Sequence, residues 1–232
     1  AVFENEIVKR ISNVKDFELH GCASFIRALS KKDFERFPFD VNYSWIPYKL
    51  VYGKTRLPIS YESIMGDADV NLFCTFNIPN LKYTKPVIVT IHDILLQKLN
   101  NDKPEIVLEY DKSVRRAISV ADHILTVSES AKRDIIEYYG LDEKKITVVY
   151  NGVNTLPFLE EYDDTFLESI RKKYNLPQKF ILYFGAIRKH KNLDGLLKSY
   201  ALLPENIKRE YHLVITKKNE DLCILADTLR IS

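Results

Sequence analysis

The sequence contains few cysteines, and their positions argue against two classes of protein. Only three occur, Cys22, Cys74 and Cys223, and no two of them form a Cys-x-x-Cys pair. An odd number of widely separated cysteines argues against a zinc site and against a secreted disulfide framework. We therefore expect reduced thiols in a cytoplasmic protein.

Excess charge and long apolar runs are also lacking. The 34 basic and 32 acidic residues among 232 give a formal net charge of +2, so charge alone indicates no nucleic-acid partner and no anionic membrane. No run approaches the roughly 18 to 20 apolar residues that span a bilayer, and we expect no signal peptide. Peripheral membrane contact on the cytoplasmic face stays open. With 46% hydrophobic residues, the chain has enough apolar side chains for a sizeable core.

The seven glycines include no Gly-x-Gly-x-x-Gly motif. That motif binds the pyrophosphate of nicotinamide cofactors in many sheets of alternating strands and helices. Its absence disfavours a nicotinamide-dependent dehydrogenase.

Residues 121–154 predict a strand, a helix and a second strand. Ser128 stands at the N-cap position of the helix, and Gly140 stands where a left-handed C-terminal residue is expected. Such a unit, within about 30 residues, predicts a parallel pair in a doubly wound α/β sheet. Because these sheets bind ligands at the carboxyl ends of their strands, Ser128, Asn151 and Gly152 are candidate binding residues. Ordinary turns are the alternative interpretation.

Residues 87–91 form the least interrupted apolar run, which is typical of a parallel strand covered on both faces. His92 and Asp93 follow it, so an imidazole and a carboxylate are expected at the carboxyl edge of the sheet. Both are candidate site residues. A helix cap or a hydrogen-bonded turn histidine is the alternative.

Residues 33–66 are aromatic and interrupted by prolines, and they give no clear pattern. We expect a short strand near 41–43, then irregular helical pieces. Trp45, Tyr48 and Tyr52 are candidates for lining a groove that takes a sugar or an apolar partner. Packing in the core is the alternative, since their spacing is helical.

Residues 180–184 predict another buried strand, which ends at Gly185. A basic loop with Arg188 and Lys191 follows, and Asn192 is expected to cap the next helix. This loop is predicted to bind a phosphate. The positive end of the helix and the nearby cations attract an anion, and a glycine lets the anion approach the backbone closely. A solvated basic loop is the alternative.

The sequence predicts three regions. We expect an amino-terminal Rossmann-like domain over 1–154, a linker and helix over 155–179, and the first part of a carboxy-terminal Rossmann-like domain over 180–232. Two strands with few helices do not cover their own sheet. We therefore expect either a longer parent protein or a second chain that supplies the remainder.

Four linked motifs resemble the retaining, nucleotide-sugar-dependent glycosyltransferases called family 4 or group 1. They are PVIVTIHDI, ADHILTVSESAKRDI, KKITVVYNGVN and FILYFGAIRKHKNLDGLLKSYALLP, which follow in the family's order and spacing over 85–216. The resemblance implies a GT-B architecture, in which two Rossmann-like domains face each other across a cleft. It implies a nucleotide-sugar donor and a glycan or lipid-linked acceptor, with no cofactor and no metal ion.

The resemblance also implies roles for single residues. His92 would be the catalytic residue that helps position the reacting sugar. Asn151 and Gly152 would lie near the donor. Lys191 would hold the donor diphosphate, with Arg188 in the same loop.

This chain departs from the family pattern in three places. The family's first strand with its glycine-rich turn would precede Ala1, and its pair of glutamates would follow Ser232. Ala186 stands where some relatives carry an arginine. We therefore keep a second hypothesis, a non-catalytic subunit with this fold that needs a partner chain for activity.

Overall fold

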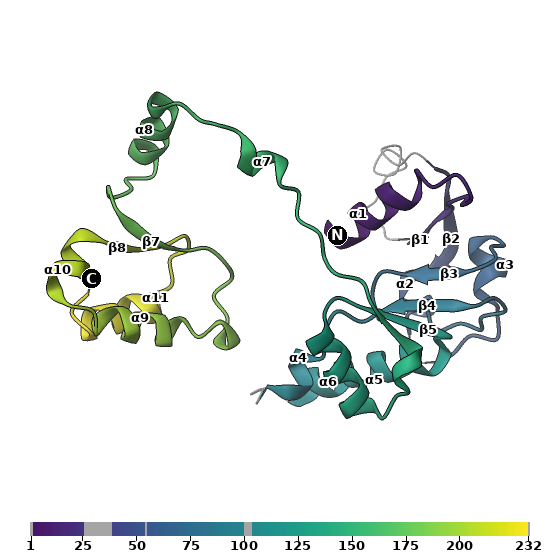
Figure 1. The fold of residues 1–232 in the computed structure, drawn as a ribbon. Coiled ribbons are helices and arrows are strands. Elements are labelled where there is room, and N and C mark those ends of the chain that lie inside the picture. The colour runs from purple at the N-terminus through teal and green to yellow at the C-terminus, as the bar shows by residue number, and fades with distance from the viewer. Residues whose placement is uncertain (1, 26–38, 54, 100–103, 232) are drawn as a thin grey trace. The chain divides into compact units, whose positions relative to one another are not determined.

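The computed structural model shows a chain that divides into two units, residues 1–153 and 154–232 (Figure 1). Each unit contains parallel strands with helices packed against them, which confirms the predicted α/β class. The structure describes residues 2–25, 39–53, 55–99 and 104–231. Within these residues, no helix is long and apolar enough to cross a membrane.

The first unit contains both strands and helices, and they alternate regularly only from Val87 onward, where helices separate successive strands. The strands are β1 (Gly21–Phe25), β2 (Val41–Pro47), β3 (Asn71–Phe73), β4 (Val87–Thr90), β5 (His123–Thr126) and β6 (Ile146–Val148). The helices are α1 (Val2–Ile11), α2 (Tyr48–Val51), α3 (Tyr61–Met65), α4 (Leu95–Lys98), α5 (Pro104–Val120), α6 (Glu129–Tyr139) and the 3-10 turn η2 (Glu143–Lys145).

A four-stranded parallel sheet, in the order β3-β4-β5-β6, forms the centre of this unit (Figure 1). Ile88 pairs with His123, and Ile124 pairs with Ile146, so the parallel pair predicted for residues 121–154 is confirmed. Val89 is fully buried, as expected for a central strand with both faces covered. The sheet packs against α5 and α6 through side chains such as Val114, Ala117 and Ile135.

Helix α6 begins and ends at the residues that the sequence indicates. The Ser128 side chain accepts a hydrogen bond from the Ala131 amide at 3.1 Å, and Gly140 closes the helix in the left-handed conformation, with φ of 66°. Ala131 and Ile135 turn toward the sheet and are buried. Local capping and apolar spacing therefore agree, which fixes the crossover between β5 and β6.

The amino-terminal part differs from the sequence prediction. Strand β2 extends to Pro47, so Trp45 lies in a strand and the helical spacing assumed for the three aromatics was wrong. The rings of Tyr48 and Tyr52 do stack, with 4.3 Å between their centroids.

The second unit has one pair of parallel strands. These are β7 (Phe180–Tyr183) and β8 (His212–Ile215). The helices are α7 (Leu156–Leu159), α8 (Asp164–Lys173), α9 (Leu193–Ala201), α10 (Glu205–Glu210), α11 (Glu220–Thr228) and the 3-10 turn η3 (Lys189–Lys191).

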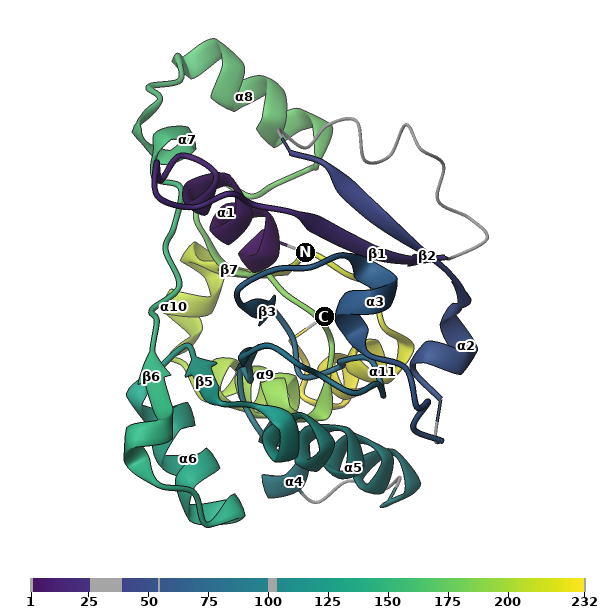
Figure 2. The ribbon, with the colours of Figure 1, turned by 90° about the vertical axis from the view of Figure 1, so that its right-hand side faces the viewer.

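Helices α9 and α11 lie on the same side of β7 and β8 (Figures 1 and 2). Leu193, Leu197 and Leu222 form the buried core there. On β7 and just after it, Leu182 is 54% exposed and Phe184 is 84% exposed. The predicted strand is present, but the prediction that it is buried was wrong, because the helices of the described second unit cover one face of this pair.

Glu62 is a buried carboxylate that joins three segments of the first unit. From α3 it accepts hydrogen bonds from Asn71 Nδ2 at 2.8 Å, the Thr84 amide at 3.2 Å and the Lys85 amide at 3.3 Å. Burial alone would raise the pKa of Glu62, but the hydrogen bonds outweigh burial and lower its pKa. Glu62 thus holds the start of β3 and the chain leading into β4.

We expect Glu62→Gln to lower the free energy of unfolding by about 1 to 3 kcal/mol at neutral pH, because charge-assisted hydrogen bonds are lost. The lowered pKa means that the Glu62 contribution is present above the pKa of the unfolded chain and is lost as pH falls through the folded-state value. Urea unfolding of both proteins from neutral to acidic pH should show the difference shrinking. The exposed Glu137→Gln is the control, and equal losses in the two variants would contradict this role.

Candidate functional site

The carboxyl ends of β4, β5 and β6 meet at one edge of the central sheet because these neighbouring strands are parallel. His92 lies just beyond β4, Ser128 just beyond β5, and Asn151 and Gly152 just beyond β6. The structure therefore brings together, on one edge, the residues that the sequence predicted for the first unit.

His92 is half-buried and its backbone is held against β5. The Ile91 amide donates to the Leu125 carbonyl at 2.8 Å, and Thr126 Oγ1 donates to the His92 carbonyl at 3.5 Å. The imidazole therefore leaves the sheet from a fixed backbone position, which a group that positions a substrate requires.

The side chains of Asp93 and Ser128 both accept hydrogen bonds from nearby backbone amides. Asp93 is exposed, and its Oδ1 accepts from the Leu95 amide at 3.0 Å, just before α4. Ser128 is the N-cap of α6, and its hydroxyl accepts from the Ala131 amide. Asn151 and Gly152 lie in exposed coil, and a side chain at Gly152 would meet nothing within 4 Å. Packing therefore does not require a glycine at that position.

The other predicted site residues lie at the carboxyl edge of β7 and β8. Gly185 follows β7, Arg188 precedes η3, and Lys191 ends it. Asn192 has φ of 51° and accepts from the Gly195 amide at 3.3 Å, so it caps α9 as predicted. The amino-terminal, positive end of α9 and two exposed cations thus share one loop, and this arrangement suits an anion.

Lys217 and Lys218 follow β8 at the same edge, and they were not among the predicted site residues. Both are exposed. Their position directly after a parallel strand was a usable signal, because β7 and β8 end on the same side. They enlarge the positive charge around the loop of Arg188 and Lys191.

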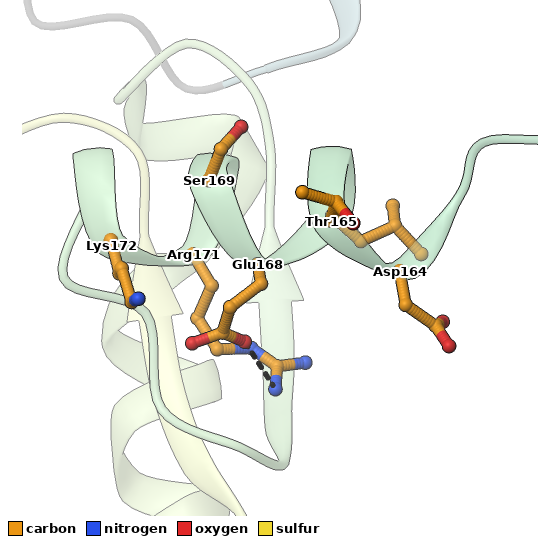
Figure 3. Close-up of a pocket in the computed structure, with 7 residues that line it drawn as sticks. Asp164, Thr165, Glu168, Ser169, Arg171 and Lys172 are labelled. Carbon is orange, nitrogen blue, oxygen red and sulfur yellow. Dashed lines mark ion pairs between the residues drawn. The ribbon is translucent and has the colours of Figure 1, made fainter.

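In the part of the chain that the structure describes, a pocket beside α8 lacks the lining from several elements that is typical of a ligand-binding site. Among the described residues, its lining comes from α8 alone, with an ion pair between Arg171 and Glu168 at 3.7 Å (Figure 3). Side chains from different elements do not converge there, so it is a weak candidate. In the described parts of the chain, no three His, Cys, Asp or Glu side chains gather closely enough to hold a metal ion.

Residues 69–155 match the profile of Glycosyltransferase Family 4. This segment contains the central sheet and the edge that carries His92, Ser128, Asn151 and Gly152. The family match therefore covers the central sheet of the first unit and its carboxyl edge.

Similar proteins include named glycosyltransferases. The serotype-specific mannosyltransferase WbdA of Escherichia coli is 31% identical over 98 residues, which are 42% of this chain and 12% of that protein. The uncharacterized glycosyltransferase MJ1069 of Methanocaldococcus jannaschii is 25% identical over 160 residues, 66% of this chain and 38% of that protein. The O-antigen chain mannosyltransferase B of Escherichia coli is 26% identical over 130 residues, 56% of this chain and 34% of that protein. The chain thus spans less than two-fifths of the length of each.

A solved structure also resembles the chain. It is Anabaena Alr3699/HepE in complex with UDP-glucose, with a TM-score of 0.49 and 16% identity over 64% of this chain and 40% of that chain. This similarity is too weak to carry an argument about the site.

Because Ser128 caps α6, we expect Ser128→Ala to lower the free energy of unfolding by about 1 kcal/mol, whereas Ser128→Asp keeps a capping oxygen and should lose little. Chemical denaturation followed by circular dichroism measures both. Ser113→Ala, within α5, is the matched control, since that residue caps no helix. Equal stability of the Ala and Asp variants at position 128 would contradict the stabilising role of the cap.

Proposed function

We propose that the protein is a glycosyltransferase that transfers a sugar from a nucleotide-sugar donor to a glycan or lipid-linked acceptor, because residues 69–155 match the profile of Glycosyltransferase Family 4. The proposal includes retention at the anomeric carbon and independence from a metal ion. The observation that supports it most is that the matched segment contains the sheet edge with His92, Asn151 and Gly152.

Mannose is the first sugar to test. WbdA and the O-antigen chain mannosyltransferase B are both named as mannosyltransferases, and both are similar to this chain. Thermal stabilisation of the protein by GDP-mannose, UDP-glucose and UDP-N-acetylgalactosamine, compared at equal concentrations, tests the choice. A ligand at 100 times its Kd stabilises by about 2.7 kcal/mol, so a true donor is readily distinguished. No stabilisation by any nucleotide sugar would contradict the proposal.

The loop between β7 and α9 is the proposed diphosphate site. Arg188 offers a planar fork of donors and Lys191 a compact cation, and the α9 amino terminus adds oriented amide groups. These groups stabilise the negative charge that develops on the departing nucleoside diphosphate. Much of the rate then comes from holding donor and acceptor in a reactive arrangement, in which His92 acts on the sugar.

A second candidate function is a non-catalytic subunit that requires a partner chain. The exposed Leu182 and Phe184 favour it, since an apolar sheet face gains stability when another surface covers it. Transferase activity of the purified protein, with no other polypeptide present, would exclude this alternative.

If His92 acts on the reacting sugar, His92→Ala should lower kcat by about 100-fold or more, the range expected for one catalytic side chain. Donor binding should change little, because the diphosphate provides most of the contacts. Release of nucleoside diphosphate in the presence of acceptor measures kcat, and calorimetry measures donor affinity. Unchanged turnover would remove His92 from the mechanism.

Arg188→Ala and Lys191→Ala should each weaken nucleoside diphosphate binding by about tenfold, which corresponds to about 1.4 kcal/mol. Lys198→Ala is the charge-matched control, because Lys198 is exposed and lies near the carboxyl end of α9. Titration calorimetry with GDP and UDP gives the affinities. If Lys198→Ala weakens binding as much as the two loop variants, the effect is one of net charge and the assigned site is wrong.

A further inference from the structure

Tyr110 lies on α5 and contacts the segment that carries His92. Its hydroxyl donates a hydrogen bond to the backbone carbonyl of Asp93 at 2.9 Å. Asp93 directly follows His92, so this bond holds the Asp93–Ile94 peptide, the second one after the His92 side chain. Thr126 Oγ1 donates to the preceding carbonyl, that of His92, at 3.5 Å, so both carbonyls after the imidazole accept a side-chain hydrogen bond.

The environment of Tyr110 keeps its hydroxyl in place and protonated. Its ring packs edge to face on Phe76, with 4.6 Å between the centroids, and both rings pack against the central core. Burial, together with the nearby Asp93 carboxylate, raises the pKa of Tyr110 to about 12. The phenol therefore remains a hydrogen-bond donor throughout the neutral range.

The far end of the same segment is tied to the next residue of α5. Gln97 Nε2, on α4, donates to the Tyr139 hydroxyl at 2.8 Å, and that hydroxyl donates to Asp111 Oδ1 at 3.1 Å. Arg115 Nε donates to Asp111 Oδ2 at 2.7 Å and holds the carboxylate. Figure 2 shows α4 beside α5, in agreement with these contacts. Two consecutive residues of α5 thus fix both ends of residues 93–97.

We propose that Tyr110 is a positioning residue, which sets the direction in which the His92 imidazole leaves β4 by holding the Asp93 carbonyl. The hydrogen bond from Tyr110 to the Asp93 carbonyl is present whatever reaction the protein catalyses. Its consequence for turnover rests on the proposed function, because only a reaction that uses His92 would sense a change in its position. Small displacements of reacting groups lower rates strongly, whereas substrate binding at other contacts is preserved.

The test is Tyr110→Phe, which removes the hydroxyl and keeps the ring against Phe76. We expect the ¹H–¹⁵N signals of the His92 imidazole, assigned by their loss in His92→Ala, to shift and broaden. We also expect kcat to fall by between about tenfold and about 100-fold, while KM for the nucleotide sugar that stabilises the protein changes less than about twofold. Unchanged His92 signals would overturn the proposal whatever the activity.

Tyr83→Phe is the matched control. Tyr83 also donates its hydroxyl to a backbone carbonyl, that of Pro79 at 2.7 Å, but it precedes β4 and so lies toward the opposite end of that strand. It should leave the His92 signals and kcat as they are. Equal effects from Tyr83→Phe and Tyr110→Phe would indicate a general loss of packing and overturn the positioning role.

Tyr139→Phe provides a second, independent variant. It removes the hydroxyl that joins Gln97 to Asp111 and releases the far end of the segment, so a smaller shift of the same His92 signals is expected. Shifted signals with unchanged kcat in the Tyr110 variant would support the anchoring while contradicting the role of His92 in turnover. Failure of the proposed function is thereby distinguished from failure of this inference.

Discussion

The parallel hydrogen bonding of β4 between β3 and β5 is the constraint on which the first unit depends. It places three strand ends on one edge and leaves almost no solvent contact along most of β4, where Val87, Val89 and Thr90 are buried. A parallel strand requires a crossover, and α5 and α6 provide it while covering the sheet. Tyr110 lies on α5 and Ser128 caps α6, so the helices that cover the sheet also position these two residues near its carboxyl edge.

Several polar side chains in this unit, with different degrees of burial, form hydrogen bonds to backbone groups around β4. Glu62 accepts from the amides of Thr84 and Lys85, and Tyr110 donates to the Asp93 carbonyl. Asp122 Oδ2 accepts from the Val87 amide at 2.8 Å, at the first residue of β4. These bonds fix where β4 begins and where its following segment goes. A rigid β4 therefore presents His92 from a single backbone conformation, a property that the central hydrophobic core alone does not guarantee.

The sequence predicted those features that local chemistry controls. The Ser128 cap, the left-handed Gly140, the Asn192 cap and the parallel pair all follow from residue type and spacing over short distances, and all are observed. The exposure of Leu182 could not be predicted from the sequence. A continuous apolar run has the same pattern whether helices cover one face of the strand or both. The contact of Tyr110 with Asp93 was also missed, since a side chain that bonds a distant carbonyl leaves no periodic pattern. The roles of the site residues were predicted from the family resemblance. The structure adds that the Ser128 side chain caps a helix and that Asp93 accepts a hydrogen bond from a backbone amide.

The two edges differ in the chemistry that they offer, and this difference narrows the reaction classes. At the first edge, Asp93 and Ser128 accept hydrogen bonds from backbone amides, and the half-buried His92 lies beside Asp93. At the second edge, Arg188 and Lys191 provide charge without a nucleophile of their own. Neither set resembles a nucleophile with its general base within hydrogen-bond distance, the arrangement that covalent hydrolases require. The proposed transfer from a nucleoside diphosphate sugar requires positioning of the reacting groups and stabilisation of a departing anion, and the cations of the second edge suit the second requirement.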